Sequence, residues 1–272
     1  MLGEEKTENI FNRILEQIKE KGIVKSFKRQ AVDTIPIIAA AALPSTSCLI
    51  YQAIKEVCGI LSPELRAEFF RETELNEEKI NHHAKPRAFF DDRRENKIKI
   101  FQKSVKRAFT ILSIVRKNGI KHESITLLEK ILQENAELNT NKEYQEKQTP
   151  HAIKSLVDRD ARIGHKSKEQ IIFGYKVGIS TTAEGITTAY ELTPMSNRDD
   201  EVLLPILNMQ EINGTKCNEV DADSAFGFIQ TFALAESKGV TLHAPLRNID
   251  PDKITAYDFA YNKQNNELTC IN

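Results

Sequence analysis

The sequence predicts an α/β fold, a mixed sheet flanked by helices, on three observations. Residues 171–180 and 186–193 are rich in β-branched and aromatic residues, and the turn pair Glu184-Gly185 separates them, which predicts two paired strands. A further strand is expected at 218–222, and a helix is expected to begin near Ala225 directly after it. Long segments elsewhere place apolar residues at steps of three and four, which is the pattern of helices that cover one face of a sheet.

Composition and charge describe an ordinary globular chain without a strong electrostatic field. The 272 residues allow one large domain or two modest ones. Because the net charge is -1, any contact with nucleic acid would have to use local basic patches. The longest apolar run, 35–43, contains Pro36 and is too short to cross a bilayer, and the first six residues are too acidic for a secretory signal. We therefore expect a cytoplasmic protein with no membrane partner. The cysteines lack the close spacings of zinc sites and are expected to be reduced thiols: Cys48, Cys58, Cys217 and Cys270.

Residues 1–70 are expected to form an N-terminal helical region. Residues 8–20 repeat apolar side chains at helical spacing, and Gly22 closes the pattern. A second helix is expected at 47–58, and Ser62-Pro63 supplies the N-cap and first residue of a third. These helices could form a small DNA-binding module, or equally a layer for packing or for dimerisation in a homo-oligomer. No residue marks a recognition helix, which favours the second interpretation.

Residues 95–156 are expected to form an inserted helical hairpin with a linker. A continuous apolar seam predicts a long helix at 95–117, which Asn118-Gly119 ends, and a partner helix is expected at 123–135 before the polar linker at 136–156. The first helix carries a series of basic residues that could follow a DNA backbone, although most charged helix faces are only solvated surfaces. These residues are Lys97, Lys99, Lys103, Lys106, Arg107, Arg116 and Lys117.

Asp223 is the strongest candidate for chemistry, because it stands between a predicted strand and the helix that follows it. A strand fixes the backbone so that a carboxylate at its end points toward a crevice. Two or three such carboxylates can hold Mg²⁺, and pairs of ions about 4 Å apart assist phosphodiester chemistry. Asp before Ser-Ala is also a good helix N-cap. The two roles are compatible, and both remain open at this point.

Four short motifs in the second half of the chain occur in a specific order and spacing. They are residues 158–166 (DRDARIGHK), 173–176 (FGYK), 193–196 (TPMS) and 222–227 (ADSAFG). Together they resemble the catalytic core of bacterial insertion-sequence transposases of the DDE type. In that family comparable motifs precede a strand, form it, end the next strand and carry the second catalytic Asp. Four ordered elements are far more specific than any lone motif.

The resemblance implies an RNase H-like fold, with an incomplete core at residues 157–272. It also implies a metal-dependent enzyme that cuts DNA at element ends and joins the freed 3′ hydroxyl to target DNA. The cofactor would be Mg²⁺ or Mn²⁺, the partners would be element-end and target DNA, and Asp223 would be a metal-binding catalytic acid. The long helical hairpin would be the insertion that this family carries between its first two core strands.

The resemblance places the first catalytic acid on a first core strand, expected within residues 71–94. Glu72-Thr73-Glu74-Leu75 occupies that place, with Glu72 as the candidate catalytic and metal-binding residue and Glu74 as its neighbour on the same strand face. The extra methylene of Glu would shift the carboxylate, and a solvated surface is an equal alternative. His82-His83 is expected to be a surface loop pair, because adjacent side chains diverge and rarely chelate one ion.

Asp158 is the second choice for the missing catalytic and metal-binding acid. A DNA-positioning role and a capping role are the alternatives for this residue. A small basic cluster beside it could meet phosphates that flank the site. Its members are Arg162, His165, Lys166 and Lys168.

The chain departs from the family's pattern in several places. Met195-Ser196 stands where the family usually has Gly-Asn, and Phe226 stands where it usually has Tyr. A third acid is expected on a later helix, and no such helix is predicted before Asn272. The sequence therefore predicts an inactive or truncated copy of a DDE transposase. The alternatives are a non-catalytic DNA-binding regulator derived from a transposase, and a structural protein whose basic helix is only solvated.

Overall fold

The computed structural model describes residues 4–85, 94–147, 149–166, 170–247, 259–262 and 267–270. The chain divides into two compact units, each described by itself below. The sheet unit comprises residues 1–35, 176–193 and 197–272, and the helical unit comprises 36–175 and 194–196. The mixed α/β architecture expected from the sequence is confirmed.

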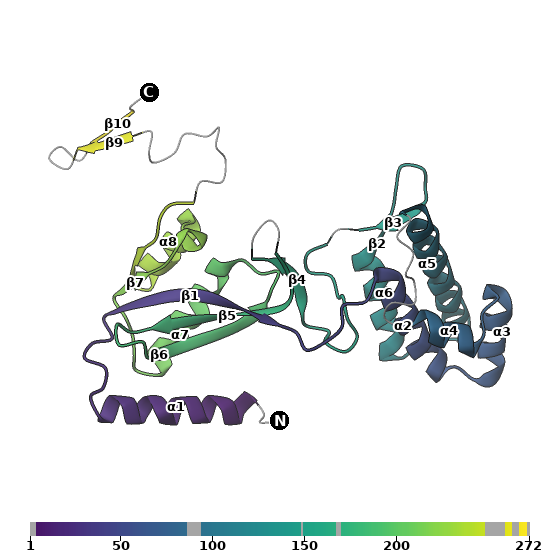
Figure 1. Cartoon of the computed structure of the whole chain (residues 1–272), viewed down its shortest axis with the longest axis horizontal. Helices are drawn as coiled ribbons and strands as arrows, with labels where there is room; N and C mark the ends of the chain where they lie inside the picture. Colours follow the sequence, from purple (N-terminus) through teal and green to yellow (C-terminus); the bar gives the residue numbers. More distant parts are fainter. Residues whose placement is uncertain are drawn as a thin grey trace. The chain divides into compact units, whose positions relative to one another are not determined.

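A mixed sheet of six strands runs in the order β4-β5-β1-β7-β8, with β6 also paired to β5 (Figure 1). β1 is parallel to β7, β7 is parallel to β8, and β4 is antiparallel to β5. The long strands β1 and β5 each begin in one unit and end in the other. The strands are β1 (Arg29–Ile38), β4 (Arg162–His165), β5 (Ile171–Thr181), β6 (Thr187–Pro194), β7 (Glu219–Asp221) and β8 (Thr241–His243).

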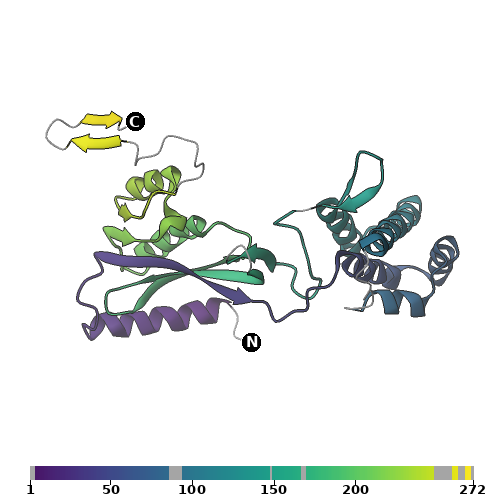
Figure 2. The same cartoon turned by 45° about the horizontal axis from the view of Figure 1, so that its top comes forward.

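Helices lie on both sides of the strands in the sheet unit. Figure 2 shows α7 and α8, in green to yellow-green, on one side of the long strands, and α1, in purple, on the other. The ring of Phe11 on α1 meets Tyr190 on β6 edge to face at 5.1 Å, and Lys19 donates to the carbonyl of Asn213 at 2.7 Å. The helical segments are α1 (Glu4–Glu20), η1 (Asp199–Val202), α7 (Leu203–Ile212), η2 (Ser224–Phe226) and α8 (Ile229–Ser237). The apolar core beneath α7 and α8 includes Val32, Leu203, Ile206, Val220, Phe226 and Leu242.

A buried polar network centres on Gln30 of β1, which is 1% exposed. Its Oε1 accepts from Ser180 and Gln210, both at 3.0 Å, and from Thr188. Its Nε2 donates to the carbonyl of Thr215 at 2.8 Å. One side chain thus links β1, β5, β6 and α7, and because buried polar groups must find partners, this network admits only one register.

The helical unit is a bundle in which α2 packs against α5 and α6. Its core draws on every helix and includes Leu49, Ile54, Phe69, Ile80, Val105, Ile111 and Leu128. Ser62 caps α3 by accepting from the N–H of Leu65 at 3.4 Å, as the Ser-Pro start signal predicts. The elements are α2 (Thr46–Ile60), α3 (Pro63–Thr73), α4 (Glu77–His83), α5 (Arg94–Lys117), α6 (Glu123–Asn135) and the hairpin of β2 (Ala136–Leu138) with β3 (Tyr144–Glu146).

Three predictions about the first half of the chain are wrong. The expected strand at Glu72–Leu75 is instead the end of α3, where Glu74 adopts a left-handed conformation with φ 56° as the C-cap. The first core strand is β1, which lies within the stretch expected to be all helical. His82 and His83 form the last turn of α4 and are not a loop pair.

The remaining described strands, β9 (Phe259–Asn262) and β10 (Glu267–Cys270), form an antiparallel pair. Within the described residues, no helix has the length and apolar character needed to cross a membrane.

Candidate carboxylate site in the sheet unit

The parallel pair β1 and β7 brings two aspartates to corresponding positions. The last residues paired in the ladder are Ala31 and Asp221, and Asp33 and Asp223 each follow two residues later. Because side chains alternate along a strand, a step of two returns to the same face. Asp33 lies on β1 beyond the paired residues and Asp223 lies two residues past the end of β7, so the register brings both to the same end of this parallel pair. Both residues are exposed.

Local backbone contacts hold each carboxylate. Asp223 is extended, with φ -80° and ψ -178°, and its Oδ1 accepts from the N–H of Ala225 at 2.8 Å as the N-cap of η2. The predicted capping role is confirmed, and it fixes one oxygen while the side chain stays exposed. The Oδ1 of Asp33 accepts from the N–H of Thr34 at 2.7 Å. Within the described residues, neither carboxylate forms an ion pair.

The acids of β7 that precede Asp223 already have side-chain partners. Arg29 donates from Nε and Nη2 to the two oxygens of Asp221 at 2.7 and 2.8 Å. This hydrogen bond is the main reason why the pKa of Asp221 lies below its usual value. Glu219 lies 3.2 Å from the Nε2 of His243. Asp221 and Glu219 are therefore engaged by other side chains, whereas Asp33 and Asp223 form no ion pair within the described residues.

Two arginines meet at one aromatic ring just after Asp223 in sequence. The guanidinium of Arg198 lies 3.8 Å from the centroid of the Phe228 ring, and that of Arg247 lies 5.1 Å from it. Arg198 is also held by both oxygens of the buried Asp200, at 2.6 and 2.9 Å. The backbone N–H of Arg247 donates to the carbonyl of Gly227 at 2.8 Å. This Arg-Phe-Arg cluster is a preorganised cationic group, and sequence reasoning missed it because its members are far apart in the chain.

Contacts within the structure account for three residues of the FGYK motif on β5, which are Gly174, Tyr175 and Lys176. Tyr175 donates its hydroxyl to Asp158 at 2.5 Å, and Lys176 pairs with Asp199 while donating to the carbonyl of Asn197 at 2.7 Å. A Cβ at Gly174, where φ is 154°, would lie 2.1 Å from the carbonyl oxygen of Ile37 on β1. The FGYK motif is therefore a set of close approaches and polar contacts that shape the strand.

Asp158 is engaged as a structural residue of the helical unit. Besides the Tyr175 hydroxyl, its Oδ1 accepts from the N–H of Ala161 at 3.0 Å, which closes the turn before β4. The proposed capping role is the one that these contacts support. Arg162 donates to the carbonyls of His151, Arg159 and Ala161, so most of its guanidinium is committed to this loop.

The other predicted site residues fall in different places. Glu72 is exposed on α3, so the prediction that it lies on a core strand with Asp223 is wrong. Lys99, Lys103 and Lys106 are exposed on α5, as a DNA-facing helix would require. Arg107, in contrast, is 7% exposed and faces the bundle. His165 and Lys166 are exposed at the end of β4, and Lys168 lies outside the described residues. The parts of the chain that the structure describes contain no group of three or more His, Cys, Asp or Glu side chains placed to hold a metal ion.

The sequence did contain a signal for Asp33. It lies in a β-branched run, Val32-Asp33-Thr34-Ile35, which is typical of a strand. Pro36 disfavoured a central strand in that run. The ladder with β7 covers only Arg29 to Ala31, so the strand tolerates a residue without an N–H beyond it. Comparison with known proteins leaves this site to be interpreted from its own geometry: no family model matches the chain, and neither the search of curated proteins nor that of solved structures gave a match.

Proposed function

We propose that the sheet unit is the RNase H-like core of a DNA transposase of the DDE type, and that Asp33 and Asp223 are its first two catalytic acids. The observation that carries the proposal is the β1–β7 register, which brings two exposed aspartates, one on β1 and one just after β7, to the same end of this parallel pair. The first strand lies inside the sheet, between β5 and β7, and α/β enzymes bind ligands beyond the carboxyl ends of parallel strands such as β1 and β7. The four-motif resemblance supports the same assignment.

The donor set fits a hard divalent ion. Mg²⁺ is commonly bound by one or two carboxylates together with water and substrate phosphates. Asp33 and Asp223 would supply such oxygens, whereas the nearby Asp221 is already held by Arg29. A bound Mg²⁺ or Mn²⁺ would polarise a phosphate oxygen and lower the pKa of an attacking water. The capping bond from Ala225 would keep the Asp223 carboxylate oriented.

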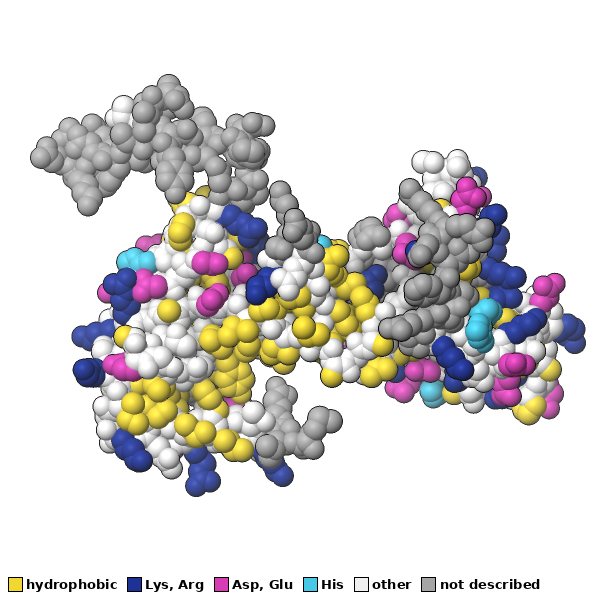
Figure 3. All heavy atoms as spheres, viewed as in Figure 1, with side chains coloured by type: hydrophobic (Ala, Val, Ile, Leu, Met, Phe, Trp, Pro, Cys, Tyr) yellow, Lys and Arg dark blue, Asp and Glu magenta, His cyan; other side chains and the backbone are white. Residues whose placement is uncertain are grey.

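DNA would meet the sheet unit through Arg247 of the Arg-Phe-Arg cluster, because the guanidinium of Arg198 is already occupied by Asp200. Guanidinium groups bind phosphate oxygens through paired hydrogen bonds, and stacking on an aromatic ring limits the entropy that binding costs. In the helical unit, Lys99, Lys103 and Lys106 are the exposed candidates for phosphate contact. On the face seen in Figure 3, lysine and arginine side chains gather over the region of α3 to α5, with acidic side chains between them.

Mn²⁺ binding tests the carboxylate pair separately from catalysis. Asp33→Asn and Asp223→Asn should each weaken Mn²⁺ binding, measured by water proton relaxation, by about ten-fold or more, because each removes a charged ligand. Glu72→Gln is the matched control, since it neutralises an exposed acid on α3, and should leave the affinity unchanged. Equal Mn²⁺ affinity in the wild type and in Asp33→Asn would contradict the proposal.

A gel assay on terminal-repeat DNA with Mg²⁺ or Mn²⁺ distinguishes the enzyme from the alternative. Strand cleavage that Asp223→Asn abolishes would establish a catalytic core. Salt-dependent DNA binding without cleavage would instead favour a non-catalytic regulator derived from a transposase. The observation that favours this second candidate is that the described residues hold no group of three or more acids, histidines or cysteines placed to bind a metal ion, whereas the family uses three acids.

A further inference from the structure

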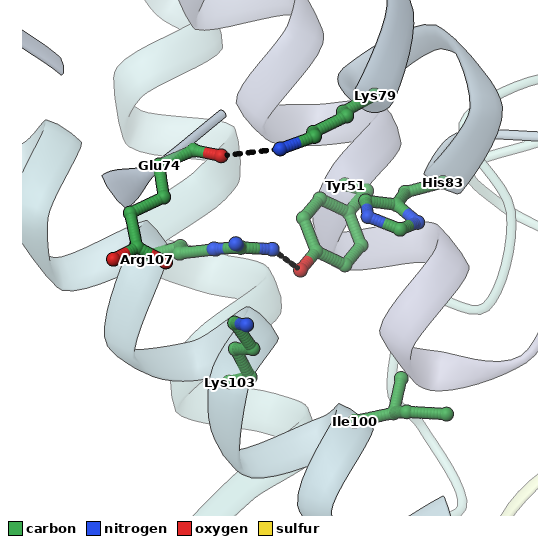
Figure 4. Close-up of a pocket in the computed structure, with 7 residues that line it drawn as sticks. All are labelled: Tyr51, Glu74, Lys79, His83, Ile100, Lys103 and Arg107. Carbon is green, nitrogen blue, oxygen red and sulfur yellow. Dashed lines mark hydrogen bonds between the residues drawn. The ribbon is translucent and has the colours of Figure 1, made fainter. Parts of the chain in front are cut away.

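A pocket of about 310 Å³ opens in the helical unit, far in sequence from Asp223. It is formed by α2, α4, α5 and the junction between α3 and α4, and Figure 4 shows the residues that line it. Among these residues, three cations and a histidine face a single carboxylate. The polar residues are Tyr51, Glu74, Lys79, His83, Lys103 and Arg107.

Arg107 forms the fixed wall of the pocket. Its Nη1 donates to the hydroxyl of Tyr51 at 2.6 Å, and its Nη2 donates to the carbonyl of Thr73 at 3.0 Å. These partners are neutral, and within the described residues Arg107 forms no ion pair. A buried guanidinium without a counter-charge is costly, so an anion in the pocket would offset part of that cost.

The two lysines approach from different helices. Lys79 of α4 donates to the backbone carbonyl of Glu74 at 3.0 Å, and the left-handed conformation of Glu74 presents that carbonyl. Lys103 of α5 is exposed beside the opening. The Glu74 side chain extends away from Tyr51 and His83 (Figure 4). Cations therefore surround the space from two helices, and the carboxylate does not occupy its centre.

The pKa of His83 is also affected by the positive charges around the pocket. Burial comes first among the causes that lower its pKa, and the cations Arg107, His82, Lys103 and Lys79 follow. The His83 and Tyr51 rings lie 4.8 Å apart, so the imidazole forms a wall of the pocket. An anion bound beside this ring would reverse the effect of the cations.

We propose that this pocket binds a phosphate group. Three cations against one carboxylate match a doubly charged anion, and the Arg107 fork, the lysines and the Tyr51 hydroxyl lie at its wall. The phosphate could come from a small free phosphate or from the backbone or end of a nucleic acid, which share this chemistry. The inference does not depend on the carboxylate pair of the sheet unit, because every residue it uses lies in the helical unit.

Inorganic phosphate is the first probe. In the full chain, its addition should shift the ring resonances of His83 in a saturable way and raise the pKa of His83, because an anion stabilises the imidazolium. Sodium chloride at equal ionic strength is the control and should not reproduce the shift. A short DNA strand with and without a 5′ phosphate forms the second arm, and tighter binding of the phosphorylated strand would identify a nucleic-acid end as the source.

Matched lysines on one helix make the test specific. Lys103→Gln should weaken binding of inorganic phosphate about ten-fold, whereas Lys117→Gln, which removes the same charge from an exposed position of α5 outside the pocket, should change it less than about two-fold. Arg107→Lys retains the charge but loses the fork, and should weaken binding by about ten-fold as well. Equal losses in Lys103→Gln and Lys117→Gln would overturn the proposal. So would the absence of a saturable His83 shift with both phosphate and DNA.

Discussion

Tyr175 donates its hydroxyl to the carboxylate of Asp158 at 2.5 Å, and this contact joins the sequence motif at 158–166, which contains β4, to the motif at 173–176. Asp158 in turn accepts from the N–H of Ala161. Asp158, which the sequence predicts as a possible metal ligand, therefore closes a turn. Tyr175, which the sequence predicts on a strand, holds the Asp158 carboxylate in place.

Removal of the Tyr175 hydroxyl should cost stability. Tyr175→Phe is expected to lower the free energy of unfolding by about 1–3 kcal/mol at neutral pH, because Asp158 loses a donor to a charged group. Urea unfolding measures the change. Tyr144→Phe, which removes a hydroxyl elsewhere in the helical unit, is the control and should change the stability less. An unchanged unfolding midpoint in Tyr175→Phe would show that the contact contributes nothing.

Tyr175 also predicts a pH dependence. Burial, followed by the hydrogen bond to Asp158, raises its pKa from 10.0 to about 12. The folded chain therefore keeps this proton between pH 10 and 12 while the unfolded chain loses it, so the stabilisation is complete below pH 10 and falls as the pH rises to about 12. Tyr175→Phe should lack this part of the alkaline loss. Identical slopes for the wild type and the variant in this range would contradict the assignment.

The Gln30 network should be sensitive to a single change. Gln30→Leu is expected to destabilise the chain by about 2–4 kcal/mol, because Ser180, Thr188 and Gln210 would lose their shared acceptor while remaining buried. Gln17→Leu replaces an exposed glutamine of α1 and should be close to neutral. Chemical denaturation of both variants makes the comparison, and similar midpoints would refute the claim that the network stabilises the chain.

Gly174 tests close approach within the sheet. Gly174→Ala should destabilise by more than about 3 kcal/mol, since its Cβ would lie 2.1 Å from the Ile37 oxygen in a conformation that L side chains rarely adopt. Gly59→Ala, where a Cβ meets nothing within 4 Å in helix α2, should stabilise by about 0.5–1 kcal/mol. Thermal unfolding separates the two, and a well-folded, equally stable Gly174→Ala protein would show that β1 and β5 pack less tightly.

Arg247 tests the proposed DNA surface of the sheet unit. Arg247→Gln should reduce duplex affinity about three- to ten-fold and make binding less salt dependent, because one phosphate contact is lost. Arg13→Gln, on the exposed face of α1, is the control and should have less effect. Fluorescence anisotropy at low and physiological salt measures both slopes. If the Arg13 and Arg247 variants behave alike, the cluster has no special role in DNA binding.

Strong local periodicity made much of the fold predictable. The seam of α5, the Ser-Pro start of α3 and the strand pair β5–β6 all lie where the sequence indicated. β1 was missed because Pro36 and an alanine-rich continuation masked a strand whose paired part with β7 is short. Because the sequence does not predict β1, the first catalytic acid is expected on the next acidic stretch that contains Thr, at Glu72. That stretch is the end of α3 and not a strand.

The site required tertiary information in two ways. Asp223 could be chosen from its place after a strand, but the proposed second acid, Asp33, depends on which strand lies beside β7, and that is a matter of topology. Arg107 illustrates the converse, because helical spacing placed it with Lys103 and Lys106 on one basic face. The structure turns its guanidinium inward to Tyr51 and leaves the lysines at the surface.

The chain leaves the sheet at the end of β1 and re-enters it through β4 and β5, and the N–H of Ala39 donates to the carbonyl of Phe173 across the two ends of this excursion at 3.0 Å. Neighbouring strands are thus connected through a bundle with its own apolar core. The entropic cost of closing a flexible loop grows with the logarithm of its length. When the intervening residues form a folded bundle, much of that cost is removed. We therefore expect the bundle to fold first and, by folding, to bring β5 next to β1. Loosening its interior should slow sheet formation even though no sheet residue is altered.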